Sequence, residues 1–220
     1  MTDWISAMGT QSFRIRTGNS VLRAEHALRR AFPLKRLNAA SAERNYSFNN
    51  VRDIRSRAVN DQSDGRETGV AALKLGDTVM KESGCEVIAA YNALLLLGRD
   101  EPLSAVARRF EQTGCLMRFP FVKYGTLGVN PYDIGSVMAS YGVDCPPAPL
   151  KQMCEPGLYI LSYWNSPKLR DGLHTIAVHN RNGICYLYNY TMKGRAGSVM
   201  DTSLFEETFR GGYITGYKLN

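Results

Sequence analysis

The sequence predicts an α+β fold in which helices come first and antiparallel strands follow. Apolar residues recur at helical spacing in segments around residues 85–97, 102–112 and 130–141. Further along, the apolar pattern shortens to the period of a strand, and two β-rich runs flank Asn182-Gly183, a strong signal for a hairpin turn. Segregated helices and strands are typical of the α+β class. The length of 220 residues suits one domain with an appendage, or two small domains.

Residues 1–70 are expected to form a basic N-terminal arm. They carry 12 Lys and Arg against 7 Asp and Glu, whereas residues 71–220 carry 15 against 13. Residues 21–32 predict a short helix that Pro33 stops, and residues 38–69, rich in Asn, Ser, Arg and Asp, predict a solvated linker. The helix has arginines at positions 23, 29 and 30 and could contact an anionic partner, either nucleic acid or a membrane surface. The favoured alternative is a helix docked on the body with solvated arginines. Nucleic acid is not an expected partner, because the sequence has no aromatic stacking pattern or nucleic-acid module.

Two helices and several strands are predicted after residue 100. One helix opens at Glu101-Pro102 and ends before Gly114. A second begins with Asn130 as N-cap and ends at Gly142. Residues 119–129 between them predict a loop or a short strand. The remaining elements are strands over residues 158–164, on both sides of the hairpin and over residues 213–219, with a short helix over residues 204–209.

Cys85 is predicted to lie in the first turn of an apolar helix. Ser83 and Glu86 have the spacing of a capping box, which makes Ser83 the expected N-cap. Unpaired N–H groups and the positive end of the helix dipole favour a thiolate at this position. A thiol there can be a nucleophile. The alternative is a buried structural thiol, because free cysteine is among the most buried residue types.

The hairpin supplies a candidate base for this thiol. If Asn182-Gly183 forms the turn, Ile176 lies opposite Asn189, and His174 and Asn189 are diagonal neighbours on one face of the sheet. His179 falls on the other face, because strand side chains alternate with period two. His174 is therefore the candidate base, and the Asn189 side-chain oxygen can accept a hydrogen bond from the N–H of its imidazole. Asp171 is a less favoured orienting group, since it lies in a loop close to His174 in sequence.

A cysteine on a helix N-terminus, followed by a histidine and an asparagine on successive strands, resembles the papain-like cysteine peptidase superfamily. Within it, residues 76–220 are similar to the compact bacterial branch of peptidase family C39. The resemblance implies a papain-like catalytic domain over residues 71–220, in which a helical subdomain bearing Cys85 packs against an antiparallel sheet bearing His174 and Asn189. It also implies a cleft between them, a peptide or protein substrate, no cofactor, and an N-terminal arm that acts as a propeptide or targeting segment.

The chain departs from the superfamily at the oxyanion hole. Papain-like enzymes place a glutamine about six residues before the cysteine, whereas Val79, Met80 and Lys81 occupy that neighbourhood here. The remaining candidate donors are the Cys85 N–H and the Lys81 side chain. Loss of one oxyanion donor commonly lowers the rate by about 100-fold to 1000-fold. Three functions stay open: a peptidase, an acyltransferase or transpeptidase in which an amine replaces water, and an inactive binding module.

Composition argues against several other classes. The five cysteines are an odd number without a C-x-x-C pair, which argues against a disulfide framework and against a zinc site. Cys185 is expected in the core, and Cys115, Cys145 and Cys154 as semi-buried thiols. No apolar run approaches the roughly 20 residues that span a bilayer. The N-terminus has no apolar segment typical of a secretory signal, so a cytoplasmic location is expected.

Overall fold

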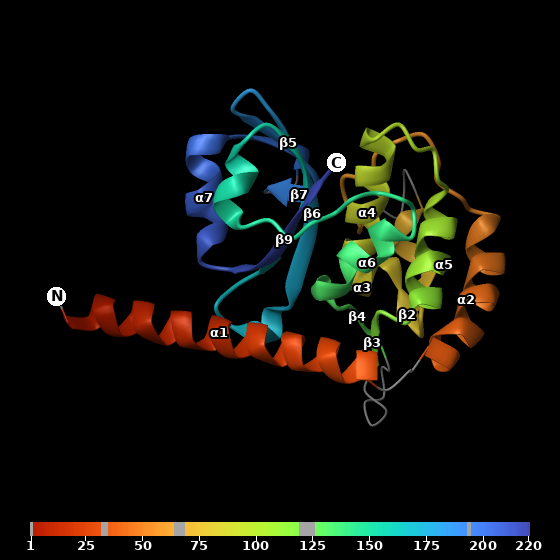
Figure 1. The fold of residues 1–220 in the computed structure, drawn as a ribbon, viewed down its shortest axis with the longest axis horizontal. Helices are drawn as coiled ribbons and strands as arrows, with labels where there is room; N and C mark the ends of the chain where they lie inside the picture. The colour runs from red at the N-terminus through yellow and green to blue at the C-terminus, as the bar shows by residue number, and fades with distance from the viewer. Residues whose placement is uncertain (1, 32–34, 64–68, 119–125, 193–194) are drawn as a thin grey trace.

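The computed structural model describes residues 2–31, 35–63, 69–118, 126–192 and 195–220. The chain combines helices with antiparallel sheets, which is compatible with the predicted α+β class. Figure 1 shows a helical part beside a five-stranded sheet, with one long helix running along the base of both. The α-helices are α1 (Thr2–Ala31), α2 (Lys35–Asn50), α3 (Met80–Ser83), α4 (Cys85–Leu96), α5 (Leu103–Thr113), α6 (Ile134–Ala139) and α7 (Thr202–Arg210).

The main sheet has the strand order β8-β7-β6-β5-β9, and every neighbouring pair is antiparallel. Two short hairpins, β1 with β2 and β3 with β4, lie outside it. The hairpin predicted at Asn182-Gly183 joins β6 to β7, with Arg181 paired to Ile184 as expected. The strands are β1 (Lys74–Leu75), β2 (Thr78–Val79), β3 (Leu116–Arg118), β4 (Thr126–Val129), β5 (Gly157–Trp164), β6 (Leu173–Arg181), β7 (Ile184–Met192), β8 (Arg195–Asp201) and β9 (Tyr213–Leu219).

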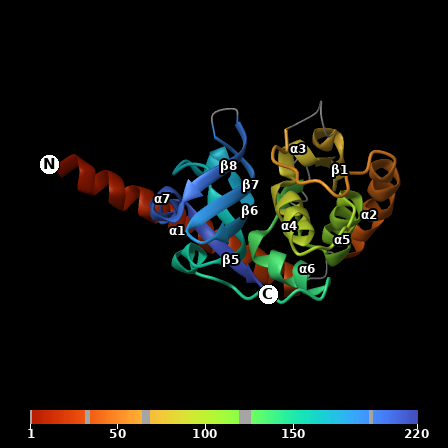
Figure 2. The same ribbon diagram turned by 90° about the horizontal axis from the view of Figure 1, so that it is seen from above.

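Helices cover both faces of this sheet. Figures 1 and 2 show α4 on one side of the strands and α7 on the other. Ala177 of β6 belongs to the apolar cluster that contains α4, whereas its neighbours Ile176 and Val178 pack in a second cluster with Phe205 of α7. Odd-numbered residues of β6 therefore face α4 and even-numbered residues face α7, as the period of two requires.

Helix α4 is at the centre of the helical part, and each of its residues from Cys85 to Leu94 is buried. The short 3-10 helix η1 (Val70–Ala72) and residues 54 and 59 pack into the same apolar cluster. The predicted helices after residue 100 are present as α5, which ends at Gly114, and as η2 (Pro131–Asp133) followed by α6. Asn130 caps η2 as predicted, because its side chain accepts a hydrogen bond from the Tyr132 N–H.

The predicted solvated linker is wrong over its first part. Residues 35–50 form α2, which packs on α5 and buries Ser41, Asn45 and Asn49. Asn49 exchanges two hydrogen bonds with the backbone of Lys74, at 2.9 and 2.7 Å. Ser41 and Asn45 both donate to the carboxylate of Glu111 on α5. The polar composition resembles that of a solvated segment, but here the amides and hydroxyls are paired with polar groups of the body.

The predicted helix over residues 21–32 is also longer than expected, since α1 spans Thr2–Ala31. In Figure 1 its first half projects beyond the sheet and its second half lies against the body. The buried stripe of the second half includes Gly18, Leu22 and Arg29. Leu22 packs with Met117 and Ile214.

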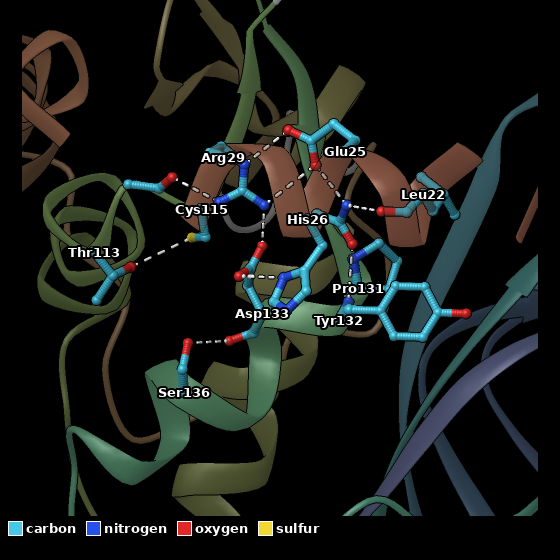
Figure 3. A network of polar contacts seen from close by, with 12 residues as sticks. Leu22, Glu25, His26, Arg29, Thr113, Cys115, Pro131, Tyr132, Asp133 and Ser136 are labelled. Atoms are coloured by element: carbon cyan, nitrogen blue, oxygen red, sulfur yellow. Dashed lines mark hydrogen bonds and ion pairs between the residues drawn. The ribbon is translucent and has the colours of Figure 1, made fainter. Parts of the chain in front are cut away.

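A polar network fixes the C-terminal end of α1 (Figure 3). Contrary to the expected solvated arginines, the Arg29 guanidinium is buried and bonds to Glu25, to Asp133 and to the carbonyl of Gly114. His26 Nδ1 lies 2.9 Å from the other oxygen of Asp133. Burial raises the pKa of Asp133, while Arg29 and His26 act in the opposite direction.

Replacing Arg29 by Met should destabilise the chain by up to about 3 kcal/mol, because it leaves Asp133 buried without its guanidinium partner. Arg16→Met is the matched control, since Arg16 is an exposed arginine on the same helix and should change the free energy of unfolding by less than about 0.5 kcal/mol. Urea unfolding measures both. Equal effects of the two substitutions would contradict the role given to Arg29.

Candidate functional site

Cys85 is the first residue of α4, and its N-cap is Gly84. The predicted capping box is wrong, because Ser83 ends the preceding short helix α3 and its hydroxyl points to the Val79 carbonyl at 3.5 Å. The apolar pattern of the sequence does not predict the short helix α3 just before Cys85. Gly84 fits this junction for a steric reason: a Cβ there would lie 2.7 Å from the Met80 carbonyl oxygen.

The Cys85 side chain lies among polar groups between α4 and the sheet. It is 6% exposed and donates to Glu86 Oε2 at 3.3 Å. The amide and hydroxyl of Thr175 on β6 contact the same sulfur. Among the described residues, Cys85 belongs to none of the three apolar clusters, although Cys115 and Cys185 do.

Glu86 extends these polar contacts to the sheet. Its side chain is 1% exposed, and it accepts from the Thr175 hydroxyl at 3.4 Å and from the Val129 backbone N–H. Thr175 in turn shares a 2.8 Å hydrogen bond with Ser162 of β5. A chain of polar groups therefore runs from the thiol, through the carboxyl, to two neighbouring strands.

These surroundings favour the protonated thiol. Burial raises the pKa of Cys85 well above its ordinary value, and the neighbouring Glu86 carboxylate raises it further. Burial also raises the pKa of Glu86 to about 7. The expected stabilisation of a thiolate by the helix N-terminus is typically about 1 kcal/mol or less. Removing a charged group from water costs more than that, so burial outweighs the helix dipole at this site.

His174 and Asn189 lie together, but not through the predicted pair of atoms. His174 Nε2 is 2.6 Å from the main-chain oxygen of Asn189, whereas the Asn189 side-chain amide donates to the Thr175 carbonyl and to Gln62 Oε1. The β6–β7 pairing runs from Arg181–Ile184 to Ala177–Tyr188, and Asn189 follows it with φ +62°. The predicted pairing of Ile176 with Asn189 is not formed in the described part of the hairpin, because this left-handed residue interrupts the ladder.

The hydrogen bond to Asn189 defines the tautomer of His174. A carbonyl oxygen can only accept, so Nε2 carries the proton and Nδ1 has the lone pair of the neutral ring. Burial lowers the pKa of His174, and the negative charge of Asp61 acts against that shift. The ring is edge-on to Tyr163, with centroids 5.9 Å apart. His174 is therefore a neutral imidazole that can accept a proton at Nδ1.

The structure brings the Cys85 segment to β6 but does not join Cys85 to His174. No hydrogen bond links the two side chains within the described residues, and the sulfur contacts Thr175 instead. The reason is strand parity. Thr175 points to the α4 face, while His174, one residue earlier, lies on the face of Tyr163, which packs on Phe209 of α7. His179 has the parity opposite to His174, as expected.

Lys81, a predicted oxyanion donor, lies at the surface, whereas Cys85 is buried. The Lys81 side chain is exposed, and its backbone carbonyl accepts a 2.9 Å hydrogen bond from Gln62 Nε2. Gln62 also contacts Asn189, as described above, so it links the segment before Cys85 with β7. Gln62 was not predicted as a site residue, because it lies 23 residues before Cys85 and outside the spacing of the papain-like superfamily.

The described residues contain no group of three or more His, Cys, Asp or Glu side chains that could hold a metal ion, and all five cysteines are free thiols. Within the same residues, no helix has the length and apolar character needed to cross a bilayer. Comparisons with models of protein families, with curated proteins and with solved structures find no match to this chain.

Replacing Glu86 by Gln should flatten the dependence of stability on pH. The pKa of Glu86 is raised from 4.5 to about 7 on folding, so the folded chain binds more protons than the unfolded chain between these pH values. The stability that protonated Glu86 contributes is fully present below pH 4.5 and is lost as the pH rises to about 7, by up to about 3 kcal/mol. Urea unfolding at pH 5, 6 and 7 should show this loss in the wild type and not in Glu86→Gln.

Glu207→Gln is the control for this measurement, because Glu207 is exposed on α7. This variant should keep the wild-type slope. A wild-type slope in Glu86→Gln as well would show that the buried carboxyl does not titrate in this range.

Proposed function

We propose that the protein is a thiol-dependent hydrolase of a peptide or related acyl bond, with a papain-like use of Cys85, His174 and Asn189. The observation that supports this proposal is the place of the thiol: it begins a helix and lies among polar groups against the strand that carries His174. Buried titratable groups with shifted pKa values are characteristic of functional sites. Asn189, on the next strand, contacts the imidazole and acts as its positioning residue.

In this proposal the observed arrangement is the resting state of the enzyme. The thiol is neutral and bonded to Glu86, and the imidazole is bonded to the Asn189 carbonyl. Formation of a thiolate requires that Glu86 be protonated, which a carboxyl with a pKa of about 7 allows near neutral pH. It also requires that the start of β6 move so that the His174 ring reaches the sulfur, because rotation of the side chain alone does not carry a strand residue to the other face of a sheet.

Catalysis would then follow the general course of acyl transfer. His174 Nδ1 takes the Cys85 proton, and the sulfur forms a bond to the acyl carbon. The developing oxyanion is bonded by the Cys85 N–H, with Gln62 Nε2 or Lys81 as a second donor. The carbon–nitrogen bond breaks as His174 gives its proton to the leaving amine. Water then hydrolyses the thioester, and an amine in place of water would give a transferase.

The second candidate is a binding module without catalysis. The observation that favours it is the state of Cys85, which is 6% exposed and has a raised pKa. On this alternative the thiol and Glu86 serve to join α4 to the sheet. The His174–Asn189 contact then fixes the start of β6 and the bulge of β7.

The rate of alkylation of Cys85 separates the two candidates. If the hydrolase proposal holds, a peptidyl chloromethyl ketone should modify Cys85 at least about tenfold faster than it modifies the half-buried Cys154. His174→Ala should lower the Cys85 rate by at least about 100-fold, the lower end of the contribution of a general base. Mass spectrometry of peptides from the intact, labelled chain measures each thiol.

His179→Ala is the matched control, because His179 lies on the same strand with the opposite parity. It should leave the Cys85 rate unchanged. If Cys85 reacts no faster than the buried Cys115, or if both histidine variants lower the rate equally, the binding module is the better account.

A further inference from the structure

A cavity of about 1270 Å³ lies between the second half of α1 and the body of the protein. Its walls come from α1, from η2 and α6, from the loop before the 3-10 helix η3 (Leu150–Cys154), and from β9. Within the described residues its lining includes neither Cys85 nor His174 nor Asn189. It is therefore a second candidate site, separate from the thiol.

The α1 wall of this cavity is basic. It contributes Arg23, His26, Arg29 and Arg30, and among the described lining residues the single carboxylate is that of Asp133. Arg29 and His26 already bond to Asp133, as Figure 3 shows. No carboxylate of the described residues forms an ion pair with Arg23 or Arg30. The positive charge of these two arginines is thus not balanced locally.

The two unbalanced arginines and His26 lie on one face of the helix. Arg23, His26 and Arg30 follow the spacing i, i+3, i+7, which puts them in a row. The rise of a helix separates the first from the last by about 10 Å along its axis. Arg23 Nε bonds to the Tyr132 hydroxyl at 3.1 Å, and its guanidinium carbon lies 5.5 Å from the centre of that ring. His26 is held through Nδ1 by Asp133, so Nε2 is the nitrogen left for another partner, and it donates to an oxyanion in the protonated ring.

The buried network gives this wall a fixed position. The guanidinium of Arg29 bonds to Gly114 in the helical part as well as to Asp133, and Asn130 Nδ2 donates to the Leu22 carbonyl and to Glu25 of α1. The row formed by Arg23, His26 and Arg30 is consequently held against the cavity before any ligand binds. A site prepared in this way loses less conformational entropy on binding than a mobile arm would.

We propose that this cavity binds a small polyanion, with oxyanion groups that are phosphates or carboxylates, through Arg23, His26 and Arg30. A guanidinium matches both kinds of oxyanion with paired hydrogen bonds. The 10 Å row fits a ligand with anionic groups at more than one point. The side chains of Tyr132 and Tyr213, which also line the cavity, offer ring surface to the rest of such a ligand.

Isothermal titration calorimetry of the full-length chain with tripolyphosphate and with citrate tests the proposal. Inorganic phosphate, which has a single oxyanion group, is the reference. At least one of the two polyanions should bind more tightly than inorganic phosphate, and the tighter one identifies the phosphate or the carboxylate source. Arg23→Gln together with Arg30→Gln should weaken that binding by at least about tenfold, since hydrogen bonds between charged groups are lost.

Arg14→Gln together with Arg16→Gln is the matched control. Both arginines are exposed on α1 outside the cavity lining, and the double variant removes the same charge. It should change the affinity by less than about twofold, and melting curves of both double variants verify that they fold. Equal weakening by the two double variants would mean attraction to the net charge of +7, which would overturn the proposal. Failure of both polyanions to bind at millimolar concentration would also overturn it.

Histidine resonances give an independent reading, because the chain has three histidines. The imidazole signals of His26 should shift on addition of the binding polyanion, while those of His174 and His179 should not. A shift confined to His174 or His179 would place the ligand elsewhere and contradict the proposal. Since these measurements do not depend on Cys85, they can fail or succeed independently of the proposed hydrolase.

Discussion

The burial of α4 against the sheet is the constraint on which the rest of the structure depends. Every residue of this helix from Cys85 to Leu94 is buried, so it has no solvent face and must be enclosed on all sides. The sheet covers one side, and α5 and residues 54 and 59 cover others. Polar residues on such a helix need partners inside the protein. Asn92 finds them in the amide and carbonyl of Val59, at 2.9 and 2.8 Å.

Enclosure of α4 also determines the chemistry of its first turn. Cys85 and Glu86 enter the interior together, and burial raises the pKa of both. The Glu86 carboxylate raises the pKa of the thiol further, because a second negative charge beside it without solvent is costly. The position at a helix N-terminus, which suggested a thiolate, is a weaker influence than this desolvation. Ionisation of the sulfur is therefore disfavoured both by burial and by a carboxyl that the chain itself supplies at the next position.

The sequence predicts the helices and strands better than the contacts between them. The hairpin at Asn182-Gly183 and the cap at Asn130 were predicted correctly, because local turn and cap chemistry determines them. Strand parity also separated His174 from His179. Strand parity alone does not predict which face of β6 packs against α4. In the structure Thr175, and not His174, lies on the face that contacts α4. The docking of α2 was missed because its buried polar residues are paired with groups far away in the sequence.

One short segment supports both candidate sites. The Val129 N–H bonds to the carboxylate of Glu86 next to the thiol, and the neighbouring Asn130 side chain bonds to Leu22 and Glu25 of α1. Gly128 precedes them with φ +96°, and a Cβ there would lie 3.3 Å from the Ser83 carbonyl oxygen, so the backbone passes close to the α3–α4 junction. Adjacent residues share planar peptide units and few free dihedrals. The docking of α1 and the burial of Glu86 therefore act on the same piece of backbone, which gives the polar groups around the thiol and the basic cavity a common support.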